Sequence, residues 1–415
     1  MVSVISVATK SHAVEVISSL CNLPDETVFG LDIETTPTAA WKDDPKAGLD
    51  PYLSNIRLVQ IYAGYDVTIV NPDSVIVTTD KCIPSKCFVF DVAETGLEVF
   101  ETLWNRSLVA HNAVFELKNL IHSGVNPSKI DCTLLQANAL YGTRPSLSDL
   151  SEKMFDWKMD KTLQKSDWGG SLTNEQFEYA ALDAVAAHRL FHVQTKELKN
   201  KNRWSCYTLM RDAQKAIARL ELAGCPFDVS KHKCLMDGWK ESVDVAHSEL
   251  KQRLNLNPDS PKQISDWLQN NITQDHLNTW PKTKTGQLQT DEDTLAAVSI
   301  PELAPLSRYK KLNKLLTTYG NGYKNHIHPI TGRIHANFMI GGTVTGRLSC
   351  RSPNIQNVPR GAEFRSLFAP SSNRVLVVAD YSQIQLRISA IVSGDEAMLK
   401  AYETGEDLHR KHRCS

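Results

Sequence analysis

Two short acidic motifs in the first half of the chain could hold a metal ion. Asp32 and Glu34 are two residues apart in an apolar segment, so a strand would place both side chains on one face of its sheet. Neighbouring carboxylates repel each other unless a cation is present, and oxygen ligands suit Mg²⁺ or Mn²⁺. Tyr179 and Asp183 are four residues apart and would share one face of a helix. Taken singly, each pair also fits an ordinary solvated surface.

A third acidic candidate lies late in the chain, where Asp380 follows the apolar run 375–379. The run predicts a strand that delivers the carboxylate at its end, where metal ligands are often found. A single aspartate in this place also commonly forms a turn.

Between these motifs, cations alternate with apolar residues in a helical pattern. The cations are Arg308, Lys310, Lys311, Lys314 and Lys324, and the apolar stripe consists of Leu312, Leu315, Leu316 and Tyr319. Cations of this kind can neutralise phosphates without reading a base sequence. The same pattern also describes a solvated basic face of a helix.

The elements that must position these residues follow from the apolar periodicity. Short apolar bursts predict strands at 28–34, 57–63, 67–70, 87–91 and 108–111. Helical spacing begins at Leu97 and recurs around 113–123, and residues 173–200 predict one long helix. A sheet followed by helices indicates an α/β fold for roughly the first 195 residues.

The pattern changes after residue 198. Residues 199–325 have few strand signals and predict helices, with loops near 255–261 and 281–286. Strands return at 333–338 and 374–380, before a helix from 384 to about 392. We therefore expect three domains, at 1–198, 199–325 and 326–415.

Length and composition agree with this division. A chain of 415 residues is expected to form two to three domains, and its net charge of −1 favours no partner by itself. No apolar run approaches the roughly 18–20 residues of a membrane span, and the N-terminus lacks a signal-peptide pattern. The nine cysteines form no CxxC pair and suit reduced thiols. We expect a cytoplasmic protein of a bacterium or a phage-infected host, with no membrane partner.

Four segments occur in the order of a known nuclease site. They are Phe29-Gly30-Leu31-Asp32-Ile33-Glu34-Thr35, Ala110-His111-Asn112-Ala113-Val114-Phe115-Glu116, Gln164-Lys165-Ser166-Asp167-Trp168 and Tyr179-Ala180-Ala181-Leu182-Asp183-Ala184. Together they resemble the 3′–5′ exonuclease of the four-carboxylate superfamily, in its tyrosine subclass. The resemblance covers about residues 25–195 and includes both the proofreading domain of family A DNA polymerases and the ribonuclease D group. It implies an RNase H-like mixed sheet and two Mg²⁺ or Mn²⁺ ions per active site.

The resemblance also implies roles for single residues. Asp32, Glu34 and Asp183 would hold the metals, Tyr179 would orient the attacking water, and Asn112 would lie beside the terminal nucleotide. One position departs from the family, because Glu116 stands where the second motif normally has Asp. A displacement of about 1 Å can cost roughly 10²-fold in rate. Either Glu116 still binds the second metal or it is a structural remnant. We expect that it has kept its function, and that Glu116→Asp leaves the exonuclease rate unchanged or raises it.

Three later segments resemble the first half of a family A polymerase palm. They are Thr343-Val344-Thr345-Gly346-Arg347-Leu348-Ser349, Pro353-Asn354-Ile355-Gln356-Asn357-Val358-Pro359 and Asp380-Tyr381-Ser382-Gln383-Ile384-Gln385-Leu386-Arg387. Residues 220–228 resemble the segment that leads from the exonuclease into the thumb. The implied fold is an α/β RNase H-like exonuclease domain, then a mostly helical thumb, then an incomplete α+β palm.

Polymerase roles follow from this resemblance. Asp380 would be catalytic and bind two metals, Arg347 would contact the primer end in the minor groove, and Gln383 would line the nucleotide site. Further DNA or nucleotide contacts are expected from Asn354, Gln356, His409, Lys310, Lys311 and Lys314. Gln385 stands where the family usually has the glutamate that excludes a ribose 2′-OH. Glutamine has nearly the same volume but no charge, so we expect steric exclusion of ribonucleotides to survive.

The expected function is that of a family A DNA polymerase in replication or repair, with DNA and dNTPs as partners. The sequence ends soon after the Asp380 motif, before any second palm carboxylate or fingers cations appear, and no 5′-nuclease domain precedes the exonuclease, as in phage or stand-alone enzymes. We therefore expect this chain alone to retain only the exonuclease activity. The alternatives are a ribonuclease D-like RNA-processing exonuclease and an inert DNA-binding fragment, or a split-polymerase subunit completed by a second half in trans.

Overall fold

The computed structural model describes residues 2–64, 66–71, 74–78, 85–160, 162–163, 166–297 and 300–406. The chain divides into two compact units, Met1–Phe368 and Ala369–Ser415, which are described separately. This boundary falls inside the region predicted as palm. The three domains predicted at 1–198, 199–325 and 326–415 stay a prediction.

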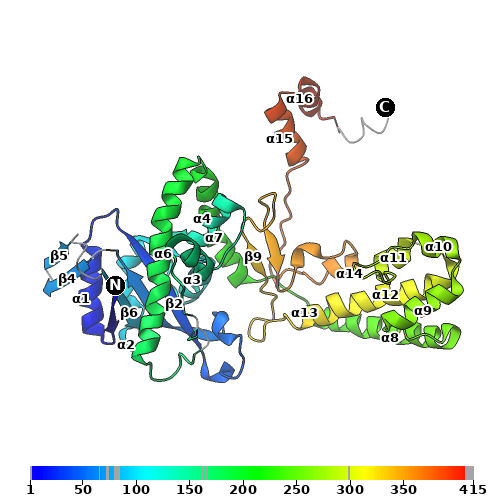
Figure 1. The fold of residues 1–415 in the computed structure, drawn as a ribbon, viewed down its shortest axis with the longest axis horizontal. Coiled ribbons are helices and arrows are strands. Elements are labelled where there is room, and N and C mark those ends of the chain that lie inside the picture. Colours follow the sequence, from blue (N-terminus) through cyan, green and yellow to red (C-terminus); the bar gives the residue numbers. More distant parts are fainter. Residues whose placement is uncertain are drawn as a thin grey trace. The chain divides into compact units, whose positions relative to one another are not determined.

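A six-stranded mixed sheet forms the centre of the N-terminal region (Figure 1). Its order is β1-β6-β3-β2-β7-β8, with β3 antiparallel to both neighbours and all other pairs parallel. The strands are β1 (Val2–Val7), β2 (Val28–Pro37), β3 (Ser54–Tyr62), β6 (Ser85–Asp91), β7 (Ser107–Ala110) and β8 (Lys129–Cys132). A separate antiparallel pair consists of β4 (Asp66–Asn71) and β5 (Ser74–Thr78). The strands predicted from apolar bursts are confirmed; the edge strands β1 and β8 were not predicted.

Helices cover both faces of this sheet, which confirms the predicted α/β fold. The long helix α6 (Asn174–Asn200) contacts β2, β3, β6 and β7, and a capping box between Thr173 and Gln176 fixes its start. Along β3, Leu58 and Tyr62 pack with α6, whereas Val59 and Ile61 belong to the core on the opposite face. That second core receives α1 (Lys10–Cys21), α3 (Val114–His122), α4 (Thr133–Tyr141) and α7 (Trp204–Ala223).

Short elements connect these layers. They are α2 (Val92–Thr95), α5 (Leu147–Phe155), η1 (Ala39–Trp41), η2 (Ala47–Leu49), η3 (Glu98–Phe100) and η4 (Leu103–Asn105). The helix predicted from Leu97 is wrong, because this stretch forms the two 3₁₀ turns η3 and η4. Phe100 donates its backbone N–H to the Leu97 carbonyl three residues back, so the apolar residues are buried without a continuous α-helix.

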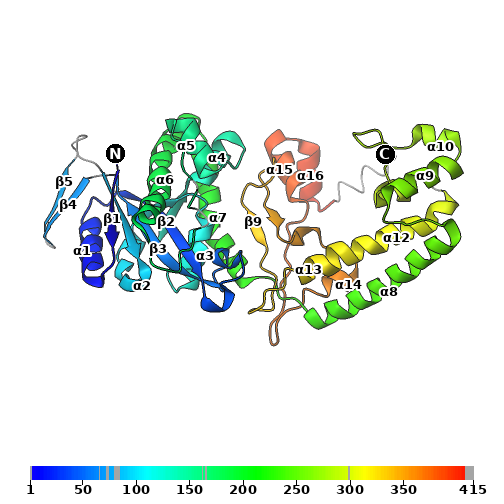
Figure 2. The same ribbon diagram turned by 60° about the horizontal axis from the view of Figure 1, so that its bottom comes forward.

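The next region is helical, as predicted, and has its own apolar core. It contains α8 (Val229–Leu254), α9 (Pro261–Asn271), α10 (Gln274–Thr279), α11 (Glu292–Ala297), η5 (Pro301–Leu303), α12 (Ala304–Lys314) and α13 (Gly322–Lys324). The helices α8 and α12 lie side by side (Figure 2). A π-helical turn, η6 (Leu315–Asn321), follows α12 and interrupts the regular helix there.

The chain then returns toward the N-terminal region. Ile334 pairs with Cys225, and Arg144 donates from Nη1 to the Ile340 carbonyl at 2.8 Å. Only part of the strand predicted at 333–338 forms. Ile334 makes an isolated bridge, and a regular strand begins only at Asn337. The elements here are β9 (Asn337–Met339), its antiparallel partner β10 (Ser349–Arg351), η7 (Ile355–Asn357) and α14 (Ala362–Arg365).

The described residues of the second unit form the helices α15 (Ile384–Ser393) and α16 (Glu396–Glu403), so the helix predicted from 384 is confirmed. The strand predicted at 375–379 is wrong. Val375, Val377 and Val378 are 82%, 85% and 91% exposed, and none of the described strands pairs with this run. An apolar run becomes a strand only where a neighbouring backbone accepts and donates its hydrogen bonds.

No helix in the described ranges has both the length and the apolar content to cross a bilayer. The described cysteines are free thiols. They are Cys21, Cys87, Cys132, Cys206, Cys225, Cys234 and Cys350.

Candidate functional site

The structure brings the predicted N-terminal carboxylates together. In the antiparallel pair of β2 and β3, Asp32 lies opposite Gln60 and Glu34 lies opposite Leu58. Both acids therefore point to the face that α6 covers. A side chain at Gly30 would collide with the Ala184 carbonyl, so α6 crosses β2 closely at this point. This close approach brings Tyr179 and Asp183 of α6 to the two acids of β2.

The fourth carboxylate reaches the same place from another element. Strand β7 ends at Ala110, and Asn112 adopts a left-handed conformation with φ of 67°, which turns the chain into α3. Glu116 lies in the first turn of α3 and is only 2% exposed. Its Oε2 atom has no hydrogen-bond partner among the described residues. An orphaned, buried carboxylate oxygen is costly unless a cation or a donor meets it.

The acids change one another's proton affinity. Burial, followed by the charges of Asp183, Glu34 and Glu116, holds the pKa of Asp32 well above its usual range. Burial and then Asp183 raise the pKa of Glu34 to about 8. Burial also raises the pKa of Glu116 to about 8; Asp183 and Glu34 add to this rise, and Lys118 opposes it. Such a cluster retains protons until cations replace them.

The donor set is chemically suited to Mg²⁺ or Mn²⁺, because it consists of carboxylate oxygens held by three different elements. In the described part of the chain, no group of three or more His, Cys, Asp or Glu side chains is arranged as a site that could hold a metal ion.

Tyr179 lies beside the acids and is itself 9% exposed. Burial and the charges of Asp183, Glu34 and Asp32 raise its pKa, so the hydroxyl stays protonated at neutral pH. The Trp168 ring lies 6.3 Å from the Tyr179 ring. Arg57 donates from Nε to the Trp168 carbonyl at 3.2 Å and so secures this loop. Gln164 and Lys165 of the predicted motif lie outside the described residues.

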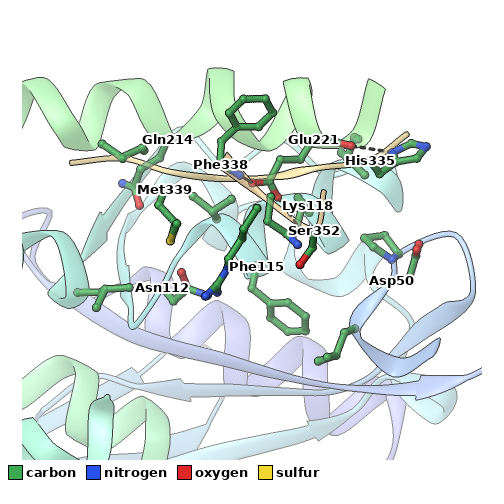
Figure 3. Close-up of a pocket in the computed structure, with 18 of the residues that line it drawn as sticks. Asp50, Asn112, Phe115, Lys118, Gln214, Glu221, His335, Phe338, Met339 and Ser352 are labelled. Atoms are coloured by element: carbon green, nitrogen blue, oxygen red, sulfur yellow. Dashed lines mark hydrogen bonds and ion pairs between the residues drawn. The ribbon is translucent and has the colours of Figure 1, made fainter. Parts of the chain in front are cut away.

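A cavity of about 550 Å³ opens next to Asn112 (Figure 3). Phe115 and Lys118 of α3 line it together with Phe338 and Ser352 from the later region. Sequence reasoning missed this arrangement, because nothing local predicts that residues near 335–352 lie against the exonuclease motif. It also missed the ion pair of Lys118 with Glu221 at 2.9 Å, since the two residues are far apart in the chain.

Only some of the predicted cations of the helical region are exposed and free of a described ion pair. Lys314 pairs with Glu292 at 2.7 Å, and burial lowers the pKa of Lys310, which is partly buried. Lys311 is exposed. The apolar stripe behaves as predicted at Leu312, which packs against the core of this region.

The predicted primer-contact residues lie on either side of the short strand β10. Arg347 is exposed, and its backbone N–H donates to Thr343 Oγ1 at 3.0 Å. Asn354 and Gln356 are exposed as well. Gln356 donates from Nε2 to the Leu348 carbonyl at 3.4 Å, which brings it next to Arg347 in the chain fold.

In the second unit, Asp380 and Gln385 are exposed. Gln383 has a φ of 53° just before α15, and its Oε1 accepts a hydrogen bond from the Tyr402 hydroxyl at 3.1 Å. His409 lies outside the described residues. The roles expected for these residues stay predictions.

Known families match the two parts of the chain in sequence order. Residues 4–199 match the family described as 3′–5′ exonuclease, and residues 232–413 match DNA polymerase family A. A ribonuclease D-like enzyme would leave the second match unexplained.

Curated relatives carry polymerase names. DNA polymerase I of Aquifex aeolicus is 30% identical over 78% of this chain and 58% of the relative. DNA polymerase I of Rhizobium leguminosarum is 31% identical over 72% of this chain and 31% of the relative. The thermostable DNA polymerase I of Thermus thermophilus is 33% identical over 58% of this chain and 30% of the relative. The chain thus spans only part of the length of the relatives it matches.

A solved structure shares the fold. The POL domain of Pol1 from M. smegmatis, in complex with DNA primer-template and dNTP, superposes with a TM-score of 0.72. The match covers 98% of this chain and 66% of that chain at 23% sequence identity, a level that supports the fold alone. Two family matches in the expected order, relatives with polymerase names and a shared fold lead to one conclusion: the chain belongs to the family A DNA polymerases and includes a 3′–5′ exonuclease domain.

Proposed function

We propose that the N-terminal region is a metal-dependent exonuclease that removes nucleotides from the 3′ ends of DNA. The observation that supports this proposal most strongly is the carboxylate cluster itself. Four acids from β2, α3 and α6 lie together, their burial and charges raise the pKa of Asp32, Glu34 and Glu116, and Glu116 Oε2 has no partner among the described residues. A structural role alone would not favour so many repelling charges in one place.

We propose that Asp32, Glu34, Glu116 and Asp183 hold Mg²⁺ or Mn²⁺, with two ions per active site. When bound, such ions would stabilise the attacking and leaving oxygens of an in-line phosphodiester displacement. The extra methylene of Glu116 fits this role, because its carboxylate is buried and reaches the same electrostatic cluster as the other acids. A remnant without function would more readily pair with a protein donor.

The remaining residues of the site position the substrate. The Tyr179 hydroxyl stays protonated, so it can donate a hydrogen bond to the attacking water and orient it. Asn112 lines the cavity, where its amide can contact the terminal nucleotide. Lys118 lines the same cavity, where its ion pair with Glu221 holds the side chain in place.

Polymerase activity is a proposal for the whole protein. It is supported by the family match over residues 232–413 and by the related solved structure, which was determined with primer-template DNA and dNTP. In that enzyme, Asp380 would bind two metal ions, Arg347 would contact the primer end, and exposed Lys311 would contact DNA phosphates. We infer a cytoplasmic location from the same family, whose curated relatives are bacterial enzymes.

One assay tests these proposals. The purified chain is incubated with end-labelled primer–template and Mg²⁺, with and without dNTPs, and in parallel with a labelled RNA of the same sequence. We expect the DNA primer to be shortened, and Asp32→Ala to abolish the shortening. Preferential degradation of RNA would favour a ribonuclease D-like activity. A primer of unchanged length under all conditions would contradict the exonuclease and favour a DNA-binding fragment.

A further inference from the structure

Gln60 is a buried amide on the same face of the sheet as the carboxylate cluster. It is 0% exposed and lies directly opposite Asp32 in the antiparallel pair of β2 and β3. Directly opposed residues point to the same face of the sheet, with Cβ atoms about 4.5–5.5 Å apart. On its other side Gln60 lies opposite Val89 of β6. Asp32 is therefore the acidic cross-strand neighbour of Gln60.

The buried amide of Gln60 has no hydrogen-bond partner in the part of the chain that the structure describes. Neither Oε1 nor Nε2 meets a donor or an acceptor among the described residues. A buried amide left in this condition costs about 1–3 kcal/mol. The next residues on the same face of β3, Leu58 and Tyr62, pack against α6, so an apolar side chain at position 60 would fit this row at lower cost.

The charge of Asp32 extends across the strand that carries Gln60. After burial, Asp32 is the cause that raises the pKa of the Cys87 thiol. Cys87 belongs to β6, and β3 lies between β6 and the β2 strand of Asp32. The Gln60 side chain therefore lies within the electrostatic field of the Asp32 carboxylate. An ionised carboxylate accepts hydrogen bonds only, so the amide N–H of Gln60 is the group that can bind it.

We propose that Gln60 is a positioning residue of the exonuclease site, whose side-chain amide donates an N–H to the Asp32 carboxylate and fixes the orientation in which Asp32 holds a divalent cation. This inference rests on the proposed exonuclease function. Partners that orient a metal ligand in this way typically change metal affinity by about 10–100-fold when they are removed. The proposal explains why the amide has no partner among the described residues, because a carboxylate that holds a cation can accept its N–H.

The test compares Gln60→Met with the matched control Gln194→Met. Gln194 is also 0% exposed, and neither of its amide atoms meets a hydrogen-bond partner in the described ranges. It lies on α6 eleven residues beyond Asp183, which is about 16 Å along a helix. Methionine keeps the volume and the flexibility of glutamine and removes only the amide.

Three quantities are measured for each protein: the melting temperature in EDTA, the Mn²⁺ affinity from the metal-dependent rise of that temperature, and kcat and KM on single-stranded DNA. We expect Gln60→Met to keep or raise the melting temperature in EDTA, to weaken Mn²⁺ binding about tenfold or more, and to lower kcat with little change in KM. Gln194→Met should leave the Mn²⁺ affinity and kcat at their original values. If Gln60→Met fails to fold, Gln60→Leu, which matches its neighbour Leu58, takes its place.

The outcomes separate this inference from the proposed function. Unchanged Mn²⁺ affinity in Gln60→Met, or an equal loss in Gln194→Met, overturns the positioning role while the exonuclease proposal stands. If the unmodified chain shows neither a Mn²⁺-dependent rise in melting temperature nor DNA shortening, both proposals are overturned.

Discussion

The chain contains two regions with a metal-type aspartate, and the structure treats them very differently. Asp32 lies in β2, which is paired on both sides and covered by α6, within reach of three more carboxylates. Asp380 lies in the second unit, where it and the whole preceding run 371–379 are exposed. A family motif can therefore identify a lineage at one place, while the described structure assembles a chemical site at another.

The difference has a simple physical origin. A strand between two others cannot shift without breaking hydrogen bonds on both sides, so β2 fixes where Asp32 and Glu34 point. Burial beside other acids then makes these carboxylates costly unless cations bind. The segment before Asp380 has no strand partner among the described residues, so neither its register nor the environment of Asp380 is fixed in the same way.

The largest expected effect comes from removing each aspartate in turn. Asp32→Ala should lower the exonuclease rate by more than the roughly 10–100-fold that loss of an outer-shell partner costs, because a direct ligand is removed. Asp380→Ala should leave that rate unchanged. Both rates are measured from the shortening of a labelled single-stranded oligonucleotide in Mg²⁺. A similar loss of exonuclease rate in both variants would show that the two aspartates do not differ in this activity.

Metal binding should stabilise only the first region. A ligand that binds the folded state at 100 times its Kd stabilises it by about 2.7 kcal/mol. We therefore expect Mn²⁺ to raise the melting temperature relative to EDTA, and this rise to disappear in Asp32→Asn. Calorimetry follows the transition. Asp380→Asn serves as the control and should keep the full rise; its loss there would mean that the stabilising ion binds elsewhere.

Without metal, the same cluster should make stability depend on pH. The pKa of Glu34 and of Glu116 is raised to about 8 in the folded state, whereas the ordinary pKa of a glutamate is 4.5. Between pH 4.5 and pH 8 the folded state therefore holds protons that the unfolded chain has released. The free energy of unfolding is therefore highest at the acid end of this window and falls as the pH rises through 8. Each of the two acids loses about 1.4 kcal/mol per pH unit over the roughly two units from pH 6 to pH 8, so we expect a total loss of about 5 kcal/mol in EDTA.

Denaturant unfolding at a series of pH values measures this loss. Glu34→Gln should reduce the slope, since one titrating group is removed and the repulsion on its neighbours falls. Asp380→Asn should leave it unchanged. A stability that rises between pH 6 and pH 9 in EDTA would show that the acids are ionised in the folded state without metal.

Much of the first region could be predicted from the sequence, because its strands and α6 have strong local patterns. The two-residue spacing of Asp32 and Glu34 and the four-residue spacing of Tyr179 and Asp183 each predict a shared face. Their convergence on one site depends on how α6 crosses the sheet. Spacing alone does not contain that information, and the resemblance to a known nuclease supplied it.

Other features had no local signal. The pairing of Lys118 with Glu221 and the entry of residues 335–352 into the cavity depend on long-range contacts. The strand predicted at 375–379 shows the opposite error. Its apolar pattern is strong, yet strand formation depends on a partner that the pattern of one segment cannot predict.

The smallest expected effect concerns the one departure inside the cluster. Glu116→Asp shortens the side chain by one methylene, at a cost of about 1 kcal/mol in stability because the residue is buried. We expect the exonuclease rate to stay the same or rise a few-fold, since Asp is the usual residue of the family at this position. The rate is measured with Mg²⁺ and with Mn²⁺. A large loss of rate in Glu116→Asp would show that the site is built around the longer carboxylate. The distance between β2 and α3 would then match the length of Glu116, and the metal spacing of this cluster would differ from that of a site with Asp.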